Sequence, residues 1–119
     1  MIIRQRQMDE IAVTTRKPFI RELEKHVRAR YPERTWATSS ERVQDDLDFL
    51  IQEACRFEIT IETDVVRFVD LNYQVGHCFY REENFSWADQ ILTSNDYSGT
   101  EKVDRIFAVI HGFTLDNQR

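Results

Sequence analysis

Histidine and cysteine are the residue types best suited to metal binding or nucleophilic catalysis, and this chain carries three histidines and two cysteines. His26, His77 and His111 lie in different segments, and no two of them have the i, i+4 spacing that helical zinc sites use. Cys78 adjoins His77, but neighbouring side chains diverge, so a site there would also need Cys55 and a distant ligand. The sequence therefore predicts no metal, no cofactor and no Cys–His nucleophile. Two reduced thiols are expected, with a Cys55–Cys78 disulfide as the alternative.

Other common catalytic patterns need glycines or carboxylates at fixed spacings. No two of the three glycines lie within six residues of each other, so no Gly-rich loop is available to hold a phosphate. The acidic run of Asp45, Asp46 and Asp48 is interpreted as a solvated helix face, with a metal or acid site as the alternative. Because 21 of the 119 residues are Asp or Glu, a chance carboxylate pair carries little weight. We expect no catalytic residues and no enzymatic activity.

The charge of the chain is unevenly distributed. Residues 1–34 hold nine Lys or Arg against five Asp or Glu, and residues 35–119 hold seven against sixteen, which gives the net charge of −5. The acidic remainder would repel phosphates, so we expect no nucleic-acid partner. The basic residues form either a solvated helix face or a surface that steers a charged protein partner. Candidate partner contacts are Arg16, Arg21, Lys25 and Arg28 on the basic face and Asp45 and Asp48 on the acidic one.

Length and composition indicate one helical domain over residues 1–119. The chain contains only 3 glycines and 2 prolines, so a few long elements are favoured over many short strands. No apolar run approaches the ~20 residues of a membrane span, and the N-terminus lacks the apolar region of a signal peptide. The expected location is the cytoplasm, with no membrane partner.

Apolar periodicity places the expected helices. The first begins at Gln5 and runs to Tyr31 with a kink or break at Pro18, and Pro32 ends it. The others are predicted with their boundary residues: 41–54 after a capping box at Thr38–Glu41, 63–75 before Gly76, 86–92 from a box at Ser86–Asp89, and a last helix from a box at Ser98–Glu101 to Gly112. Residues 77–84 are expected to form a loop.

The segment 63–75 is predicted to be the centre of the fold. Its apolar residues leave little room for a polar side, and a helix of that kind must be enclosed by other elements. The resulting fold class is an all-α bundle of four to five helices. Because apolar and polar residues alternate from Phe57 to Glu62 and again from Val69 to Val75, a small β-hairpin at 57–75, in an α+β fold, is the alternative.

Two tryptophans lie at element boundaries. Trp36 falls in a connection and Trp87 at a helix start close to Tyr80 and Phe85. Such aromatic clusters are usually core plugs, but exposed tryptophans also anchor protein partners. Trp87 is therefore added to the candidate partner contacts.

The pattern of apolar and structural positions resembles a group of small helical bacterial proteins encoded beside PAAR, VgrG and toxic-effector genes of type VI secretion clusters. The residues that carry the resemblance span nearly the whole chain: Arg4–Met8, Phe19, Leu23, His26–Arg28, Tyr31–Pro32, Phe57–Ile59, Asp64–Leu71, Gly76 and Ser86–Leu92. The resemblance implies an accessory or adaptor protein that binds a secreted effector or a PAAR/VgrG spike component. The alternative is an immunity protein that blocks a cognate toxin. Self-association into a homo-oligomer is compatible with both.

Overall fold

The computed structural model describes residues 13–116, with side-chain environments for residues 16–112, and this part of the chain is α-helical without any β-strand. The helices are α1 (Val13–Arg30), α2 (Pro32–Thr35), α3 (Ser40–Arg56), α4 (Glu62–Gln74), α5 (Ser86–Thr93) and α6 (Gly99–Asp116). The all-α bundle is confirmed, and α4 occupies the segment for which a hairpin was the alternative. The helix beyond the expected four or five is α2, a single turn. None of the described helices is long and apolar enough to cross a membrane.

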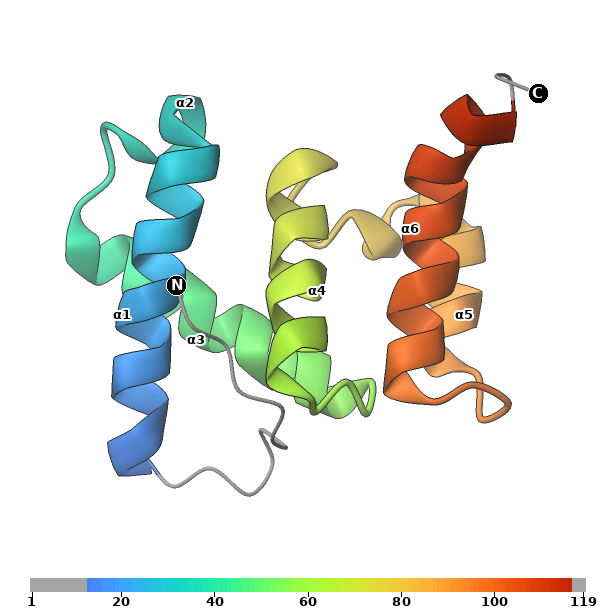
Figure 1. Cartoon of the computed structure of the whole chain (residues 1–119), viewed down its shortest axis with the longest axis horizontal. Coiled ribbons are helices and arrows are strands. Elements are labelled where there is room, and N and C mark those ends of the chain that lie inside the picture. Colours follow the sequence, from blue (N-terminus) through green and yellow to red (C-terminus); the bar gives the residue numbers. More distant parts are fainter. Residues whose placement is uncertain (1–12, 117–119) are drawn as a thin grey trace.

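The helices form two layers (Figure 1). Helices α1, α4 and α6 lie side by side, while α3 crosses behind α1 and α4, and α5 lies behind α6. The packing partners agree with this view, since α3 contacts α1 and α4, and α6 contacts α4 and α5. Helix α4 therefore lies between the two ends of the molecule, as its apolar sequence predicts.

Burial of α4 is nearly complete. Nine of its residues are buried, and besides the apolar set around Phe68 and Val69 these include Glu62, Asp64, Asp70 and Asn72. The helix begins at Glu62 and ends at Gln74, each one residue earlier than predicted. Gly76 follows with a φ of +150°, a backbone conformation that favours glycine.

Two predicted helix starts needed correction. The Thr38–Glu41 box does not form, because the N-cap is Ser39, whose side chain accepts a hydrogen bond from the backbone of Arg42 at 3.2 Å. Ser86 is already the first residue of α5, and Phe85 precedes it without a side-chain cap. In both cases the observed N-cap lies one residue from the predicted one. The three-residue spacing of a capping box does not by itself distinguish between neighbouring positions for the helix start.

Both hydrogen bonds of the third predicted capping box, at Ser98–Glu101, are present. The backbone N–H of Ser98 donates to Glu101 Oε1 at 3.0 Å, and the N–H of Glu101 donates to Ser98 Oγ at 3.1 Å. The predicted stop at Gly112 is wrong, because α6 continues through it to Asp116. Glycine lowers helix propensity by only about 1 kcal/mol, which the surrounding residues of a long helix can offset.

Both prolines lie in or beside helices. Pro18 lies inside α1, which stays a single helix, and the predicted helical residues 5–12 lie outside the described part of the chain. After α1 ends at Arg30, Pro32 opens α2 as its first residue, where a missing backbone N–H costs nothing.

The segment 77–84, which was predicted to form a loop, contains short helical turns. Short 3-10 turns at Phe79–Arg81 and Glu83–Phe85 turn Phe79 and Tyr80 into the core, where both are almost fully buried. The Tyr80 ring packs at 90° against that of Phe57 with centroids 5.3 Å apart. No disulfide joins Cys55 and Cys78, so the alternative pairing is wrong; Cys78 is buried and Cys55 half-buried.

Candidate protein-binding groove

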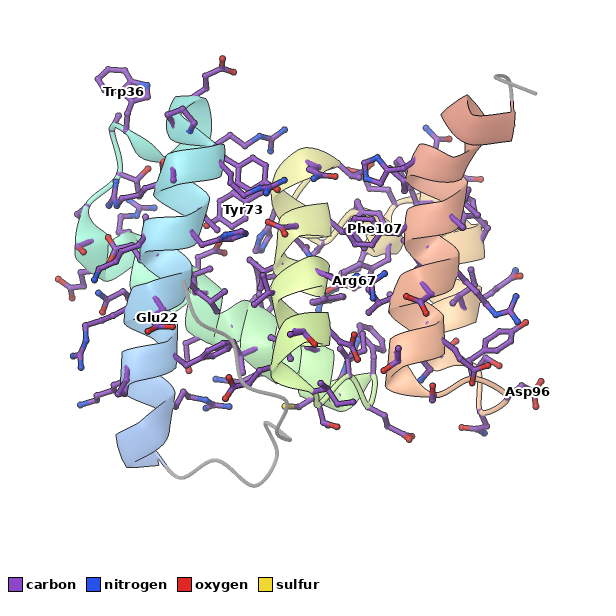
Figure 2. The ribbon with its side chains drawn as sticks, in the orientation of Figure 1. Glu22, Trp36, Arg67, Tyr73, Asp96 and Phe107 are labelled. Atoms are coloured by element: carbon purple, nitrogen blue, oxygen red, sulfur yellow. The ribbon has the colours of Figure 1, made fainter. Side chains whose placement is uncertain are left out.

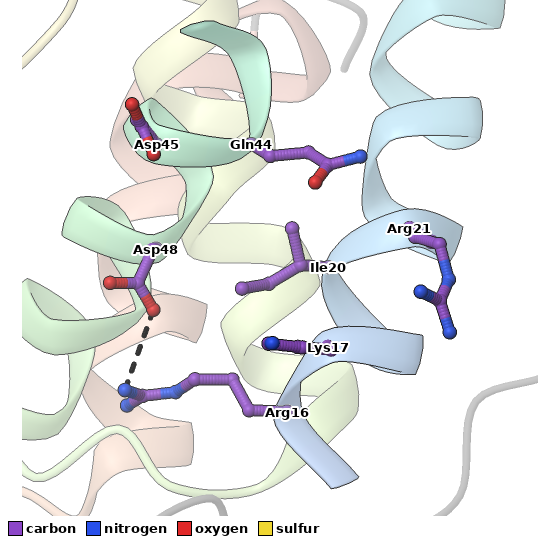
Figure 3. A pocket seen from close by; sticks show the side chains of 7 residues that line it. All are labelled: Arg16, Lys17, Ile20, Arg21, Gln44, Asp45 and Asp48. Carbon is purple, nitrogen blue, oxygen red and sulfur yellow. Dashed lines mark ion pairs between the residues drawn. The ribbon is translucent and has the colours of Figure 1, made fainter. Parts of the chain in front are cut away.

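A groove of about 460 Å³ lies between the N-terminal half of α1 and the first half of α3. Arg16, Lys17 and Arg21 form one wall, which we call the basic wall, and Asp45 and Asp48 form the other, the acidic wall. Figure 3 shows the basic side chains projecting from α1 and the acidic ones from α3. The structure thus brings together Arg16, Arg21, Asp45 and Asp48, four of the predicted partner contacts.

Helical spacing explains the two walls. Residues three and four apart share a helix face, so Arg16, Lys17 and Arg21 come to one side of α1 together with Ile20. Ile20 itself is only 8% exposed and lies between the walls, where it supplies an apolar floor. The same spacing on α3 aligns the carboxylates of its acidic wall.

The charges of the groove are mostly unused within the described part of the chain. One ion pair crosses it, between Arg16 Nη1 and Asp48 Oδ1 at 3.4 Å. No ion pair or side-chain hydrogen bond joins Lys17, Arg21 or Asp45 to any other residue in the range 16–112. Within residues 16–112, two cations and one carboxylate at the groove therefore have no ion-pair partner.

A buried carboxylate fixes α1 to the start of α3 beside the groove. Glu24 is 9% exposed and accepts hydrogen bonds from Ser40 Oγ at 2.5 Å, Gln44 Nε2 at 2.9 Å and Arg28 Nε at 2.8 Å. Burial raises the pKa of Glu24, but the hydrogen bonds from Ser40, Gln44 and Arg28 outweigh it and leave the pKa lowered. Glu24 therefore stays ionised and holds the two walls at a fixed separation.

Arg28, another predicted partner contact, does not line the groove and makes hydrogen bonds within the fold. Besides its bond to Glu24, its guanidinium donates to the carbonyls of Thr35 and Thr38, each at 2.8 Å. These bonds close the loop between α2 and α3. Trp36 lies in that loop and is 79% exposed, pointing away from the helices (Figure 2). Of the two tryptophans, Trp36 is thus the more exposed one.

The other predicted contacts lie outside the groove. Lys25 is exposed on α1 but does not line the groove. Trp87 is half-buried on α5, with its ring centroid 6.1 Å from that of Phe85, and it lines a separate surface groove together with Tyr97 and Val109. The predicted contacts therefore do not form one continuous surface.

Sequence reasoning missed a set of buried acidic residues that join the helices. Each accepts a hydrogen bond from a residue distant in sequence, and the pairs are Glu53 with Tyr80 and Arg81, Asp64 with Thr100, and Asp70 with His26 and Tyr31. Burial and the bond to Glu53 raise the pKa of Tyr80. The one available signal was the position of Asp64 and Asp70 within the most apolar segment of the chain. In the described part, no group of three or more His, Cys, Asp or Glu is arranged to hold a metal.

The Asp45–Asp48 region accordingly has the geometry of a charged helix face opposite a basic one. The groove has no buried polar group without a partner, since every buried side-chain N or O atom in the described residues has one. What the groove offers is complementary charge around an apolar floor. Comparison of the chain with protein-family models, with curated proteins and with solved structures finds no match.

Proposed function

We propose that this protein is a non-enzymatic protein–protein interaction module whose partner docks into the groove between α1 and α3. The observation that carries the proposal is the pairing of a basic wall and an acidic wall around Ile20, with Lys17, Arg21 and Asp45 unpaired among the described residues. Complementary charges give specificity and fast association more than raw affinity. Such a surface suits a partner that must be chosen among many in the cell.

The two walls define what the partner must present. A segment lying in the groove needs acidic groups toward α1, basic groups toward α3 and a small apolar side chain over Ile20. Because Glu24 and its three donors fix the two helices relative to each other, the groove is preformed and little ordering cost is added on binding.

The family resemblance suggests the partner class. We propose a cytoplasmic accessory or adaptor protein of a type VI secretion cluster that binds a secreted effector or a PAAR/VgrG spike component. An immunity protein that binds a cognate toxin is the second outcome of the experiment below, because the same groove could block a basic or acidic patch of a toxin.

Charge reversal tests the groove. The protein is co-expressed with the effector and spike proteins encoded beside it, and complex formation is measured for wild type, Arg21→Glu, Asp45→Lys and the matched control Lys25→Glu. Both groove variants should weaken the complex about tenfold or more, and increasingly so at low salt, while Lys25→Glu should bind like wild type. Unchanged binding by both groove variants would refute the proposal.

A toxicity assay separates the two roles. If the protein is an adaptor, the effector remains toxic when both are produced together but is not delivered without it. If it is an immunity protein, its presence abolishes toxicity, and the groove variants restore it.

A further inference from the structure

A second, smaller pocket of about 290 Å³ lies on the other side of α3, where α2, α3 and α4 meet. It is lined by Arg34, Asp46, Leu50, Asn72, Tyr73 and His77. None of these residues lines the α1–α3 groove, because Asp46 is one residue, or about 100°, around α3 from Asp45. The pocket is therefore a separate site that can be tested independently of the groove.

The carboxylate of Asp46 already has two partners within the protein. Its Oδ2 accepts from the Tyr73 hydroxyl at 3.2 Å, and its Oδ1 lies 3.2 Å from Nδ1 of His77. The phenol is held in place by stacking of Tyr73 on Tyr31, with ring centroids 5.5 Å apart, on the side of α4 that faces α1 (Figure 2). The short distance to Asp46 places Nδ1 on the Asp46 side of the His77 ring, and Nε2 is the ring nitrogen without an ion pair or hydrogen bond among the described residues.

The groups left unused in the pocket are hydrogen-bond donors. Arg34 has no ion pair or side-chain hydrogen bond with any other described residue in 16–112, so the N–H groups of its guanidinium are available. The His77 ring adds a donor at Nε2 when it is protonated. Asn72 is only 3% exposed, with one amide N–H donating to the carbonyl of Phe68 and its amide oxygen accepting from the backbone of Cys78, so it presents little to a ligand.

These donors match a carboxylate. A guanidinium binds a planar carboxylate through two parallel hydrogen bonds, and His77 can supply a third from another direction. A phosphate dianion would suit the pocket less well, because it would lie beside the negative charge of Asp46. The ring of Tyr73, which lies over the fully buried Leu50, provides apolar surface for a short aliphatic group attached to the carboxylate.

We propose that this pocket binds a small monocarboxylate with a short aliphatic group, held by Arg34 and His77. The carboxylate can belong to a free aliphatic acid or to the C-terminal residue of a peptide, since the pocket recognises the same group in both. The site is distinct from the groove of the proposed function and does not depend on it.

Isovalerate, isovaleramide, N-acetyl-leucine and inorganic phosphate are titrated into the 15N-labelled full chain, and amide shifts are followed by NMR. Isovalerate or N-acetyl-leucine should give saturable shifts at Leu50, Tyr73 and His77. Isovaleramide, which has the same shape without the charge, should not. Tighter binding of N-acetyl-leucine assigns a peptide C-terminus, and tighter binding of isovalerate assigns a free acid.

Two variants and one control complete the test. Arg34→Gln should weaken carboxylate binding about tenfold or more, and His77→Gln should weaken it by a smaller factor. Arg42→Gln removes an exposed arginine of α3 that does not line the pocket, and it should bind like wild type. Absence of saturable shifts, equal binding of isovaleramide, tighter binding of phosphate, or unchanged affinity in Arg34→Gln would each overturn the proposal.

Discussion

Replacement of Gly99 by alanine should destabilise the fold, because the start of α6 rests directly on the backbone that leaves α3. A Cβ at position 99 would meet the carbonyl oxygen of Glu58 at a distance no real Cβ shows, and would lie 2.9 Å from Ile59 Cα. The opposing atoms are backbone and cannot rotate away as the end of a side chain could. Either α6 or the 57–59 turn must therefore shift.

The turn below Gly99 has little freedom to move. The N–H of Ile59 donates to the carbonyl of Ala54 at 2.8 Å and that of Glu58 donates to Cys55 at 2.9 Å, the pair of bonds that defines a Schellman motif. Glu58 lies in the left-handed region with φ of 64°. Moving this turn would break the C-terminal cap of α3, so the cost falls in the upper part of the overpacking range, about 2–3 kcal/mol.

The matched control is Gly112→Ala in the same helix. The nearest heavy atom to a Cβ at this position is Ala108 Cβ at 3.7 Å, an ordinary van der Waals contact. Because α6 passes through Gly112, alanine should instead stabilise the helix by about 0.5–1 kcal/mol. The two substitutions are chemically identical and opposite in predicted sign.

Thermal and urea denaturation followed by circular dichroism measure both effects. For a domain of this size, each kcal/mol corresponds to roughly 4 °C in Tm, so Gly99→Ala should lower Tm by about 8–12 °C and Gly112→Ala should raise it by about 2–4 °C. An unchanged or higher Tm for Gly99→Ala would show that α6 does not rest on the 57–59 turn. A loss of stability in Gly112→Ala would show that the helix does not continue through this glycine.

Three further substitutions test other parts of the structure. Glu58→Gly removes the cost of a left-handed glutamate and should raise the free energy of unfolding by about 1 kcal/mol in urea titrations, so a decrease would contradict the Schellman assignment. Glu24→Gln should reduce stability at neutral pH and flatten its pH dependence. Because the pKa of folded Glu24 is lowered, its contribution is present above the unfolded pKa and is lost as pH falls through the folded one. Urea midpoints measured from neutral pH down to pH 3 check this, and equally steep acid limbs in both proteins would count against it. Tyr80→Phe leaves Glu53 with Arg81 but without the phenol, and should cost about 1–2 kcal/mol in the same assay, whereas an unchanged midpoint would mean that the Tyr80–Glu53 bond contributes nothing.

The sequence was sufficient where local pattern and burial agree. The α4 segment is so apolar that a helix formed by it must be enclosed by other elements. The Ser98–Glu101 capping box was predictable because the donors and acceptors of its two hydrogen bonds lie within four residues. The basic and acidic walls were also predictable, because helical spacing alone puts their residues on single faces. That the two walls lie opposite each other depends on how α1 and α3 pack, which no spacing within either helix encodes.

The errors have a common physical origin in interactions between distant residues. Glu58 is a poor candidate for a left-handed cap, so the sequence does not indicate the Schellman motif at the end of α3, yet the approach of Gly99 and the burial of Ile59 hold Glu58 in that conformation. The hydrogen bonds of Arg28 could not be predicted, because the carbonyls it binds belong to a loop whose course follows from the fold.

Buried polar groups in the core of this protein also depend on interactions between residues distant in sequence. Lys102 is almost fully buried and its ammonium group donates to the carbonyl of Phe57 at 2.8 Å, across an interface that forms only when α6 packs on the end of α3. In sequence it falls in the first turn of an amphipathic helix, where a solvated lysine is the ordinary expectation. Its bond and the Gly99 contact fall on the same turn, Phe57 to Ile59, so one short segment receives both a close backbone approach and a buried cation. That segment, together with the fully buried Val103 and Ile106 of α6, determines where α6 lies on the bundle.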